Sequence, residues 1–409
     1  MRRWCKKLNQ DVMSVKLQSF GNKVVLVMNG HLDTATSQKM QDEIQKLLAK
    51  AGNFDQLICD VEGVSYISSS GLRLLLNMAK RYPSFRVVEA QPEVYHVLDM
   101  TGFTKIMPVD RALRKMSVKG CEHIGSGGVG EVYRIDDDTI IKVFREGSTM
   151  EEVNTEMTMA KEAFVMGMPT AISFDVVRID NQLGLVYELL RARTLGACLK
   201  DEPERIDEFA QQYASLFQQL HAIHVPKGGI IPSAKAHVKQ SVRHIARYFD
   251  TASIDLMLQL AEMIPDANRL LHCDLQAKNA MIQDGEPMLI DMGEVGYGHP
   301  VIDLGNSYSS MVSLVGDYEA IIGLPQELSN ELWMRMIKYY FKDEPADVVA
   351  HRIEQIDAVS RIRNFSWLAL SDSFPKELIR MCQNLFAERV LQQKDHLLEV
   401  YATLSDWKA

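Results

Sequence analysis

The sequence predicts two folded parts in one chain: an α/β domain over residues 14–113 and a larger α+β domain over residues 119–409. Short β-rich runs alternate with helical periodicity in the first part. The second part begins with β-rich runs and continues with long helical patterns. Residues 114–120, a basic stretch with serine and glycine, have no apolar periodicity, so we expect the domain boundary there.

The elements of the first part follow from turn and periodicity signals. A β-hairpin is expected around Gly21-Asn22, because both residues accept the positive φ of a tight turn. Apolar residues at helical spacing then predict a helix with Asp33 or Thr34 as its N-cap. The further elements are expected in the order strand 57–61, helix 70–82, strand 86–89 and helix 94–100.

The second part is expected to begin as a sheet and to continue as helices. Residues 124–133 and 139–144 are predicted to form two strands joined by an acidic turn, and two further strands are expected at 173–178 and 184–188. Apolar stripes at residues 206–220 and 328–340 predict long helices.

Composition excludes several classes of protein. The chain has 409 residues, of which 46% are hydrophobic and 24% charged, as in folded proteins of two or three domains. A net charge of −9 argues against a protein that coats nucleic acid or an anionic membrane. The six cysteines form no C-x-x-C pair, which fits a reducing cytoplasm and neither a zinc ribbon nor a disulfide framework. We expect no membrane span and no signal peptide.

A glycine-rich stretch is the first chemical signal. Gly125-Ser126-Gly127-Gly128-Val129-Gly130 fits G-x-G-x-x-G and leads into a strand, whereas a dinucleotide-binding fingerprint would open a helix. Gly125, Gly127 and Gly130 therefore predict a loop whose backbone covers the phosphates of a nucleotide.

Lys142 stands alone among apolar neighbours on a predicted strand. A half-buried lysine needs an anionic partner, and Glu156 on the following helix is the best candidate, with Glu152 and Glu162 as alternatives. Lys142 would then hold the α/β phosphates of ATP while Glu156 fixes its position. The plainer alternative is a surface lysine whose charged end reaches solvent.

The strongest signal is a pair of motifs, His272-Cys273-Asp274-Leu275-Gln276-Ala277-Lys278-Asn279 and Leu289-Ile290-Asp291-Met292-Gly293-Glu294. This spacing assigns Asp274 as the catalytic base that accepts a proton from an attacking hydroxyl, and Asn279 and Asp291 as ligands of a Mg²⁺ ion that bridges the phosphates of ATP. Asp291 follows an apolar run, as expected for a ligand at the end of a strand. If all three were structural caps, three matched spacings would be coincidence.

These motifs resemble those of the protein-kinase-like superfamily. Within it the chain is similar to aminoglycoside phosphotransferases and choline kinase-type small-molecule kinases, on residues 220–224, 270–275 and 298–304, the last of the G-x-P-x-x-D-L type. The resemblance implies a bilobal α+β fold with an N-lobe over 119–190 and a helical C-terminal lobe over 191–409. It also implies a hinge over residues 187–190 whose backbone, at Glu188 and Leu190, binds the adenine of ATP.

Two positions depart from the usual pattern of these kinases. Cys273 replaces glycine or arginine after the motif histidine, and Met292 replaces phenylalanine or tryptophan in D-x-G. Neither change removes a metal ligand, so an active enzyme is expected. No A-P-E segment follows Glu294, which argues against a conventional protein kinase. The acceptor is left open among an antibiotic, an amino sugar, a choline-like alcohol and a protein serine.

Residues 14–113 resemble a STAS domain, the fold of anti-sigma factor antagonists, on residues 29–33, 57–61 and 66–75. In that family a serine just before a glycine at a helix N-terminus is phosphorylated, and Ser70 holds this position, although Ser68 stands where the family usually has aspartate. A helix N-terminus stabilises an added phosphate, while the phosphate disrupts an apolar docking face. The alternative is that Ser68, Ser69 and Ser70 only cap the helix.

Two functions follow as hypotheses. In the first, the chain is an ATP- and Mg²⁺-dependent phosphotransferase that is regulated by its STAS domain and acts on a small-molecule hydroxyl or on Ser70 of its own STAS domain. In the second, the STAS domain docks an anti-sigma factor-like protein, and the kinase-like domain binds nucleotide with little turnover.

Overall fold

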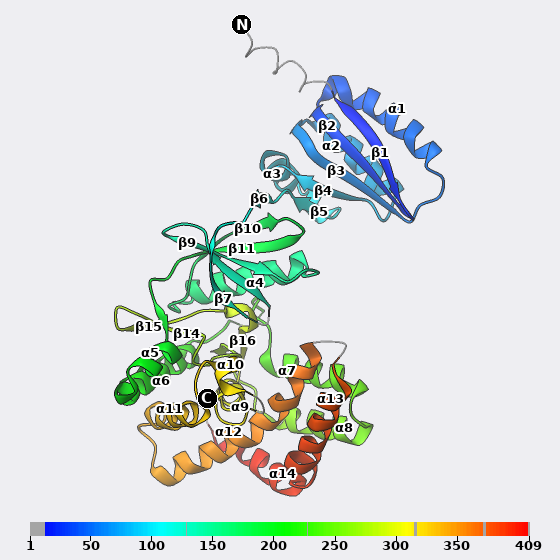
Figure 1. The fold of residues 1–409 in the computed structure, drawn as a ribbon. Coiled ribbons are helices and arrows are strands. Elements are labelled where there is room, and N and C mark those ends of the chain that lie inside the picture. The colour runs from blue at the N-terminus through cyan, green and yellow to red at the C-terminus, as the bar shows by residue number, and fades with distance from the viewer. Residues whose placement is uncertain (1–12, 128, 227, 315–316, 371–373, 408–409) are drawn as a thin grey trace. The chain divides into compact units, whose positions relative to one another are not determined.

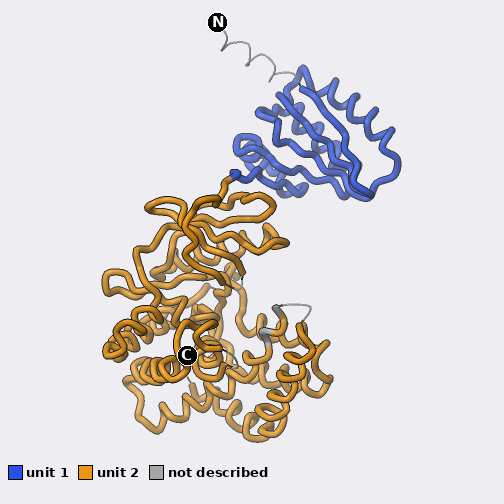
Figure 2. The backbone as a smooth tube through the Cα atoms, viewed as in Figure 1, with its two compact units in different colours: residues 1–115 blue, residues 116–409 orange. Residues whose placement is uncertain are grey.

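The computed structural model describes residues 13–127, 129–226, 228–314, 317–370 and 374–407. The chain divides into two compact units, Met1–Lys115 and Met116–Ala409 (Figure 2).

Unit 1 is an α/β domain built on one sheet (Figure 1). β1 runs antiparallel to β2, and the remaining neighbours are parallel. The strand order is β1-β2-β3-β4-β5, with bounds β1 Ser14–Phe20, β2 Lys23–Leu32, β3 Gln56–Ile67, β4 Arg86–Ala90 and β5 Val109–Arg111. The helices of the unit are α1 Thr34–Lys50, α2 Ser69–Arg81 and α3 Pro92–Met100.

The predicted hairpin and helices of unit 1 are confirmed. Gly21 turns between β1 and β2 with φ of 58°, and the Asp33 side chain accepts hydrogen bonds from the first turn of α1. The strand predicted over 57–61 is longer, because β3 continues beside β2 to Ile67. Beyond Val61 only every third residue of β3 is buried, so the alternation that marks a strand is lost there.

Unit 2 begins with a six-stranded sheet. Its order is β6-β10-β11-β9-β8-β7, with bounds β6 Arg114–Met116, β7 Glu122–Ser126, β8 Gly130–Arg134, β9 Thr139–Phe144, β10 Ser173–Ile179 and β11 Gln182–Glu188. α4, Met150–Val165, packs against β10 and β11.

One expectation for this region was wrong, and one strand was not predicted. The expected boundary segment, residues 114–120, begins as strand β6, whose short, mostly exposed sequence has no periodicity; its pairing with β10 makes it a strand. Residues 124–133 form no single strand, because the glycine-rich stretch separates β7 from β8.

The rest of unit 2 is mainly helical (Figure 1). Its helices are α5 Leu195–Asp201, α6 Ile206–Ala222, α7 Ala234–His244, α8 Thr251–Met263, α9 Pro300–Met311, α10 Tyr318–Ile322, α11 Gln326–Tyr340, α12 Ala346–Ser366, α13 Lys376–Phe386 and α14 Lys394–Ala402. The helices predicted over 206–220 and 328–340 are confirmed as α6 and α11, which pack together around buried Phe217 and Trp333. No helix among the described residues is both long and apolar enough to cross a membrane.

Short strands among these helices carry the motif segments. β12 (Arg193–Thr194), β14 (Ala280–Gln283) and β15 (Glu286–Leu289) form one small sheet, and β13 (Arg269–Leu271) pairs with β16 (Gly296–Gly298). The segment from His272 to Asn279 therefore joins β13 to β14, and Asp291 follows β15. Both motifs lie in connections whose ends are fixed by backbone pairing.

Candidate active site

Three charged side chains from separate elements meet in unit 2. Lys142 Nζ on β9 lies 2.8 Å from Glu156 Oε1 on α4 and 3.0 Å from Asp291 Oδ1 after β15. The Lys142 and Glu156 side chains are 12% and 8% exposed. Lys142 is therefore no surface lysine, and Glu156 is its partner. The alternative Glu152 instead accepts the Thr149 N–H in the capping box of α4.

Mutual attraction between Lys142 and the neighbouring carboxylates keeps these side chains ionised. Burial by itself would lower the pKa of Lys142, but Asp291 and Glu156 outweigh it, and the pKa is raised. Burial would likewise raise the pKa of Asp291, and the Lys142 ammonium lowers it instead. The ammonium is therefore retained between two carboxylates, where it can also meet the oxygens of a phosphate.

A buried aspartate holds the loop that carries Asp274. The oxygens of Asp303, on α9, accept the backbone N–H groups of His272 at 3.0 Å and Cys273 at 2.8 Å. His221 Nε2 on α6 also lies 3.2 Å from Asp303 Oδ2. Cys273 takes a left-handed backbone conformation with φ of 66°, which the two backbone hydrogen bonds donated to Asp303 keep in place.

Asp274 lies beside an amide and a guanidinium. Asn279 Nδ2 donates to the Asp274 carbonyl at 2.8 Å and to its Oδ2 at 3.2 Å. Arg363, on α12, approaches the other carboxylate oxygen to 4.0 Å. Burial raises the pKa of Asp274, and the Arg363 charge opposes this shift. The carboxylate is thus a stronger base than an exposed aspartate.

Asn279 and Asp291 have the donor chemistry for Mg²⁺. The Ile290 N–H donates to the Asn279 carbonyl at 3.0 Å, which ties the loop to the end of β15. Because Asn279 Nδ2 is used on Asp274, its amide Oδ1 is the side-chain atom that can ligate a cation. The described residues contain no group of three or more His, Cys, Asp or Glu side chains able to hold a metal. A single carboxylate with one amide oxygen fits Mg²⁺, which takes its other ligands from phosphates and water.

The glycine loop between β7 and β8 contains one glycine that packing requires. A Cβ at Gly130 would lie 2.1 Å from the Val143 carbonyl oxygen, so only glycine permits this approach of β8 to β9. A Cβ at Gly125 would meet nothing within 4 Å, and the Gly127 N–H donates to the Gly130 carbonyl at 2.8 Å. Gly128 lies outside the described residues.

The expected adenine-binding segment begins at Glu188, the last residue of β11. The Glu188 carboxylate accepts the Ile172 N–H at 2.7 Å and the Glu188 N–H donates to the Ile172 carbonyl at 3.0 Å, so the backbone carbonyl is the remaining group for the predicted role. The Leu189 N–H is used by the Asp138 carbonyl at 2.7 Å, and Leu190 follows it.

The hydroxyl groups of Ser68 and Ser70 in unit 1 make different contacts. Ser68 is the N-cap of α2: its hydroxyl accepts the Gly71 N–H at 3.4 Å and donates to the Leu32 carbonyl at 3.2 Å. The Ser70 hydroxyl instead lies 3.4 Å from Thr34 Oγ1, at the start of α1. Capping therefore accounts for Ser68 and leaves Ser70 unexplained.

Comparison with known proteins decides the family. The model of the phosphotransferase enzyme family (APH) matches residues 120–329, just over half of the chain. The chain belongs to the phosphotransferase enzyme family. The STAS domain model matches residues 14–116, so both resemblances seen in the sequence are confirmed.

Individual relatives of this phosphotransferase are distant. BtrV of Bordetella bronchiseptica is 25% identical over 101 residues, which are 24% of this chain and 85% of that protein. The anti-sigma F factor antagonist of Paenibacillus polymyxa is 22% identical over 101 residues, 24% of this chain and 86% of that protein. Among solved structures, a choline/ethanolamine kinase family protein from Mesorhizobium loti is 14% identical, with a TM-score of 0.44 and coverage of 70% of this chain and 92% of that one.

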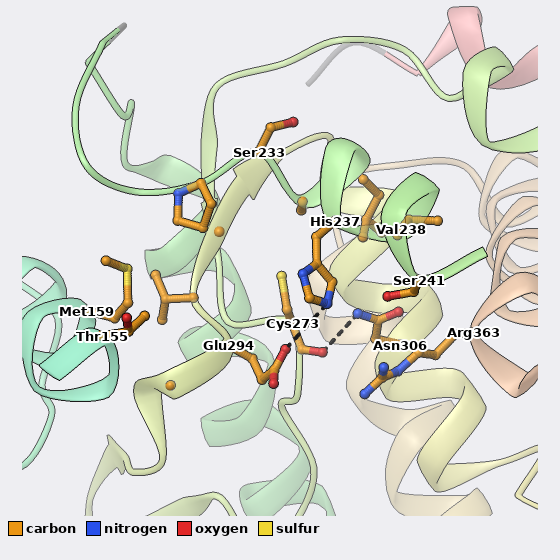
Figure 3. Close-up of a pocket in the computed structure, with 16 residues that line it drawn as sticks. Thr155, Met159, Ser233, His237, Val238, Ser241, Cys273, Glu294, Asn306 and Arg363 are labelled. Carbon is orange, nitrogen blue, oxygen red and sulfur yellow. Dashed lines mark hydrogen bonds and ion pairs between the residues drawn. The ribbon is translucent and has the colours of Figure 1, made fainter. Parts of the chain in front are cut away.

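The phosphotransferase domain has a pocket beside Asp274. The pocket is a cavity of about 210 Å³ between α4, α7, α9, α12 and the segment after Asp291 (Figure 3). Cys273, Glu294, His237, Asn306 and Arg363 line it. Asn306 Nδ2 donates to the Cys273 carbonyl at 2.8 Å, which fixes the wall next to Asp274.

Sequence reasoning missed two side chains of the site. Tyr187 donates its hydroxyl to Glu156 Oε1 at 2.7 Å, and burial together with that carboxylate raises its pKa well above the usual value. Arg363 reaches Asp274 from α12. Tyr187 was expected only as part of the adenine-binding segment 187–190, for its backbone, and no motif includes Arg363. No local signal therefore identified either side chain.

Proposed function

We propose that this chain is an ATP- and Mg²⁺-dependent phosphotransferase that transfers the γ-phosphate of ATP to a hydroxyl of a small molecule. We assign this activity to residues 119–409, with the N-lobe over 119–190 and the C-lobe over 191–409. The observation that carries the proposal is the meeting of Lys142, Glu156 and Asp291 within 3.0 Å. The hydrogen bond from the Ile290 N–H to the Asn279 carbonyl ties the segment of Asp291 to the loop that carries Asp274.

Nucleotide binding is assigned to the N-lobe and the segment after it. Lys142, held by Glu156, would bind phosphate oxygens under the loop of Gly125, Gly127 and Gly130, and the backbone of Glu188 and Leu190 would bind adenine. Asn279 and Asp291 would hold Mg²⁺, which neutralises charge on the phosphates when bound.

Asp274 is the proposed base. Its carboxylate would accept the proton of the acceptor hydroxyl as the oxygen attacks the γ-phosphorus, while the β–γ bond breaks and ADP leaves. Asn279 orients the carboxylate through Oδ2. The buried setting, which raises the pKa of Asp274, makes it a better proton acceptor.

The test is Asp274→Asn, which keeps the shape of the side chain and removes its basicity. We expect a loss of at least ~100-fold in turnover with retained ATP affinity, since general base catalysis contributes about that much or more. Asp284→Asn, the same change at an exposed turn residue, is the control and should be neutral. Full turnover in Asp274→Asn would rule out the proposed base.

A second acceptor is Ser70 of the STAS domain. The hydroxyl of Ser70 is not used as the helix cap, since Ser68 has that role, and it lies at a helix N-terminus where a phosphate is stabilised. Incubation with Mg²⁺ and ATP, followed by intact mass and phosphopeptide mapping, should then show one phosphate on Ser70 that is absent from Asp274→Asn and Ser70→Ala. An unmodified Ser70 in a protein that turns over a small molecule would reject this acceptor.

Regulation is the role proposed for unit 1. A STAS domain of the antagonist type would dock an anti-sigma factor-like protein, and phosphate on Ser70 would disrupt that docking face. In the alternative function this docking is the main activity and the kinase-like domain turns over weakly. Turnover that is fast and unaffected by deletion of residues 14–113 would reject that alternative.

A further inference from the structure

The pocket beside Asp274 carries both signs of charge. On one wall, Glu294 Oε2 lies 3.8 Å from His237 Nε2 (Figure 3). On another, Arg363 extends from α12 near Asn306, with its side chain 26% exposed and its guanidinium 4.0 Å from Asp274 Oδ1. Glu294 is thus paired with His237, and Asp274 is paired with Arg363.

This lining is unsuited to a cationic acceptor. Among the described residues of the pocket wall there is no Phe, Tyr or Trp, so no aromatic face is available for a quaternary ammonium group. Glu294 is the single carboxylate among the described lining residues, and a polyamine needs several. An acceptor ammonium group close to Asp274 would also meet the Arg363 guanidinium, and like charges repel.

Arg363 has the properties of an anion-binding group. A guanidinium presents planar paired donors that match a carboxylate or a phosphate, and its partial burial strengthens the attraction. The guanidinium lies 4.0 Å from Asp274 Oδ1, which places it next to the proposed base. Arg361, two residues earlier on α12, donates to Asp357 Oδ2 and to the Arg389 carbonyl, which fixes the helix at this point.

We propose that the acceptor is a small hydroxyl compound with an anionic group, a carboxylate or a phosphate, and that Arg363 binds this anion while the hydroxyl lies at Asp274. Because the guanidinium and the base are neighbours, the two groups of the acceptor should be separated by only a few bonds. The inference rests on the proposed phosphotransferase function and narrows its substrate class.

The experiment compares matched acceptors on the full chain. ADP release from Mg²⁺-ATP is measured with glycerol, glycerate and glycerol 3-phosphate, which share hydroxyls and differ in charge, and with choline and kanamycin as cations. The same panel is run on Arg363→Gln and on Arg335→Gln, the same change at a residue on α11 paired with Asp207 and Glu331.

We expect kcat/KM for glycerate or glycerol 3-phosphate to exceed that for glycerol, and Arg363→Gln to reduce this ratio about tenfold to a hundredfold, as for a lost hydrogen bond to a charged group. The ratio of kcat/KM for an anionic acceptor to kcat/KM for glycerol is the decisive quantity. If Arg363 acted only on Asp274, its replacement would change kcat/KM by the same factor for every acceptor. Arg335→Gln should leave the ratio unchanged. A higher kcat/KM for glycerate would identify a carboxylate as the anionic group of the acceptor, and a higher kcat/KM for glycerol 3-phosphate would identify a phosphate.

Two results would overturn the inference while the proposed function stands: faster turnover of choline or kanamycin than of the anions, or an anion-to-glycerol ratio that Arg363→Gln does not change. If nothing in the panel is turned over, the compounds are ranked by the melting temperature of the protein with AMP-PNP and Mg²⁺. Stabilisation by the cations alone then counts against the inference. Retained turnover in Asp274→Asn would instead remove the proposed function.

Discussion

At the residue scale, the pKa values of two aspartates of the site, half-buried Asp274 and fully buried Asp303, are shifted in opposite directions. Burial raises the pKa of Asp274. Burial also favours the neutral form of Asp303, but the hydrogen bond and charge of His221 and the backbone N–H of His272 outweigh it, and the pKa of Asp303 is lowered. Asp274 is therefore a stronger proton acceptor than an ordinary aspartate, whereas Asp303 is held in its anionic form and braces the loop.

The pH dependence of activity should report Asp274. As base it must be ionised, so kcat/KM should fall as pH falls through the pKa of Asp274, which burial raises above the ordinary aspartate value. Arg363→Gln removes the cation that opposes this shift, so the acid limb should move to higher pH. The position of the acid limb is measured from pH–rate profiles of the unmodified protein and Arg363→Gln, with Arg335→Gln as the control. An acid limb that stays in place in Arg363→Gln would show that Arg363 does not act on Asp274.

At the element scale, the N-terminus of α2 separates Ser68 from Ser70. Ser68→Ala removes the cap and should destabilise the first turn by ~1 kcal/mol, so that amide exchange there becomes about fivefold faster. Ser70→Ala should leave this exchange unchanged, because the Ser70 hydroxyl lies 3.4 Å from Thr34 Oγ1 and is not the cap of α2. Hydrogen–deuterium exchange of the full chain measures both.

The outcome for the cap can be checked with a conservative variant. Ser68→Asp places the residue usual in the family at the N-cap, where aspartate also accepts a backbone N–H. Amide exchange in the first turn of α2 should therefore be as slow in Ser68→Asp as in the unmodified protein. Equal exchange in Ser68→Ala and Ser70→Ala would contradict the assignment of the cap.

The start of α9 predicts a pH-dependent stability. His299 Nδ1 accepts the Val301 N–H and Nε2 lies 3.1 Å from the Trp407 carbonyl, and burial lowers the pKa of His299 to about 4. In the unfolded chain the pKa is about 6.5. Between these values only the unfolded chain binds the proton, so the free energy of unfolding should fall by about 1.4 kcal/mol per unit as pH drops from 6.5 to 4.

Urea unfolding at pH 7 and pH 5 measures this effect. His299→Asn keeps an acceptor for the Val301 N–H and has no titrating group, so the difference between the two pH values should shrink. His396→Asn, at a half-exposed histidine, should retain the full difference. A pH dependence that survives in His299→Asn would assign it to other groups.

At the scale of the whole molecule, strand β6 joins the sequence of unit 1 to the sheet of unit 2. Met116 and Val118 pack against the core of that sheet, formed by Ile141, Val143, Val177, Ile179 and Val186. A shortened chain that starts at residue 119 loses these contacts, whereas one that starts at residue 112 keeps them. The shorter chain should melt roughly 4–8 °C lower, from about 2 kcal/mol of lost burial. Equal melting temperatures would show that β6 contributes nothing to the sheet.

The fold was predictable where the signal is local. The hairpin at Gly21, the helix behind Asp33 and the stripes of α6 and α11 each lie within one short window of sequence. β6 was missed because a three-residue edge strand with exposed side chains is defined only by its partner. After Val61 only every third residue of β3 is buried, so the alternation that marks a strand is lost, and pairing with β2 defines this part of the strand.

The sequence by itself determined two domains, their families and the residues of the phosphoryl-transfer motifs, because those motifs are contiguous and their spacing reflects local backbone geometry. Only the tertiary structure decided that Lys142 meets Asp291, 149 residues away, and that Arg363 and Tyr187 join the site. Such contacts depend on how helices and strands pack, and packing is a property of the whole chain that no short motif contains.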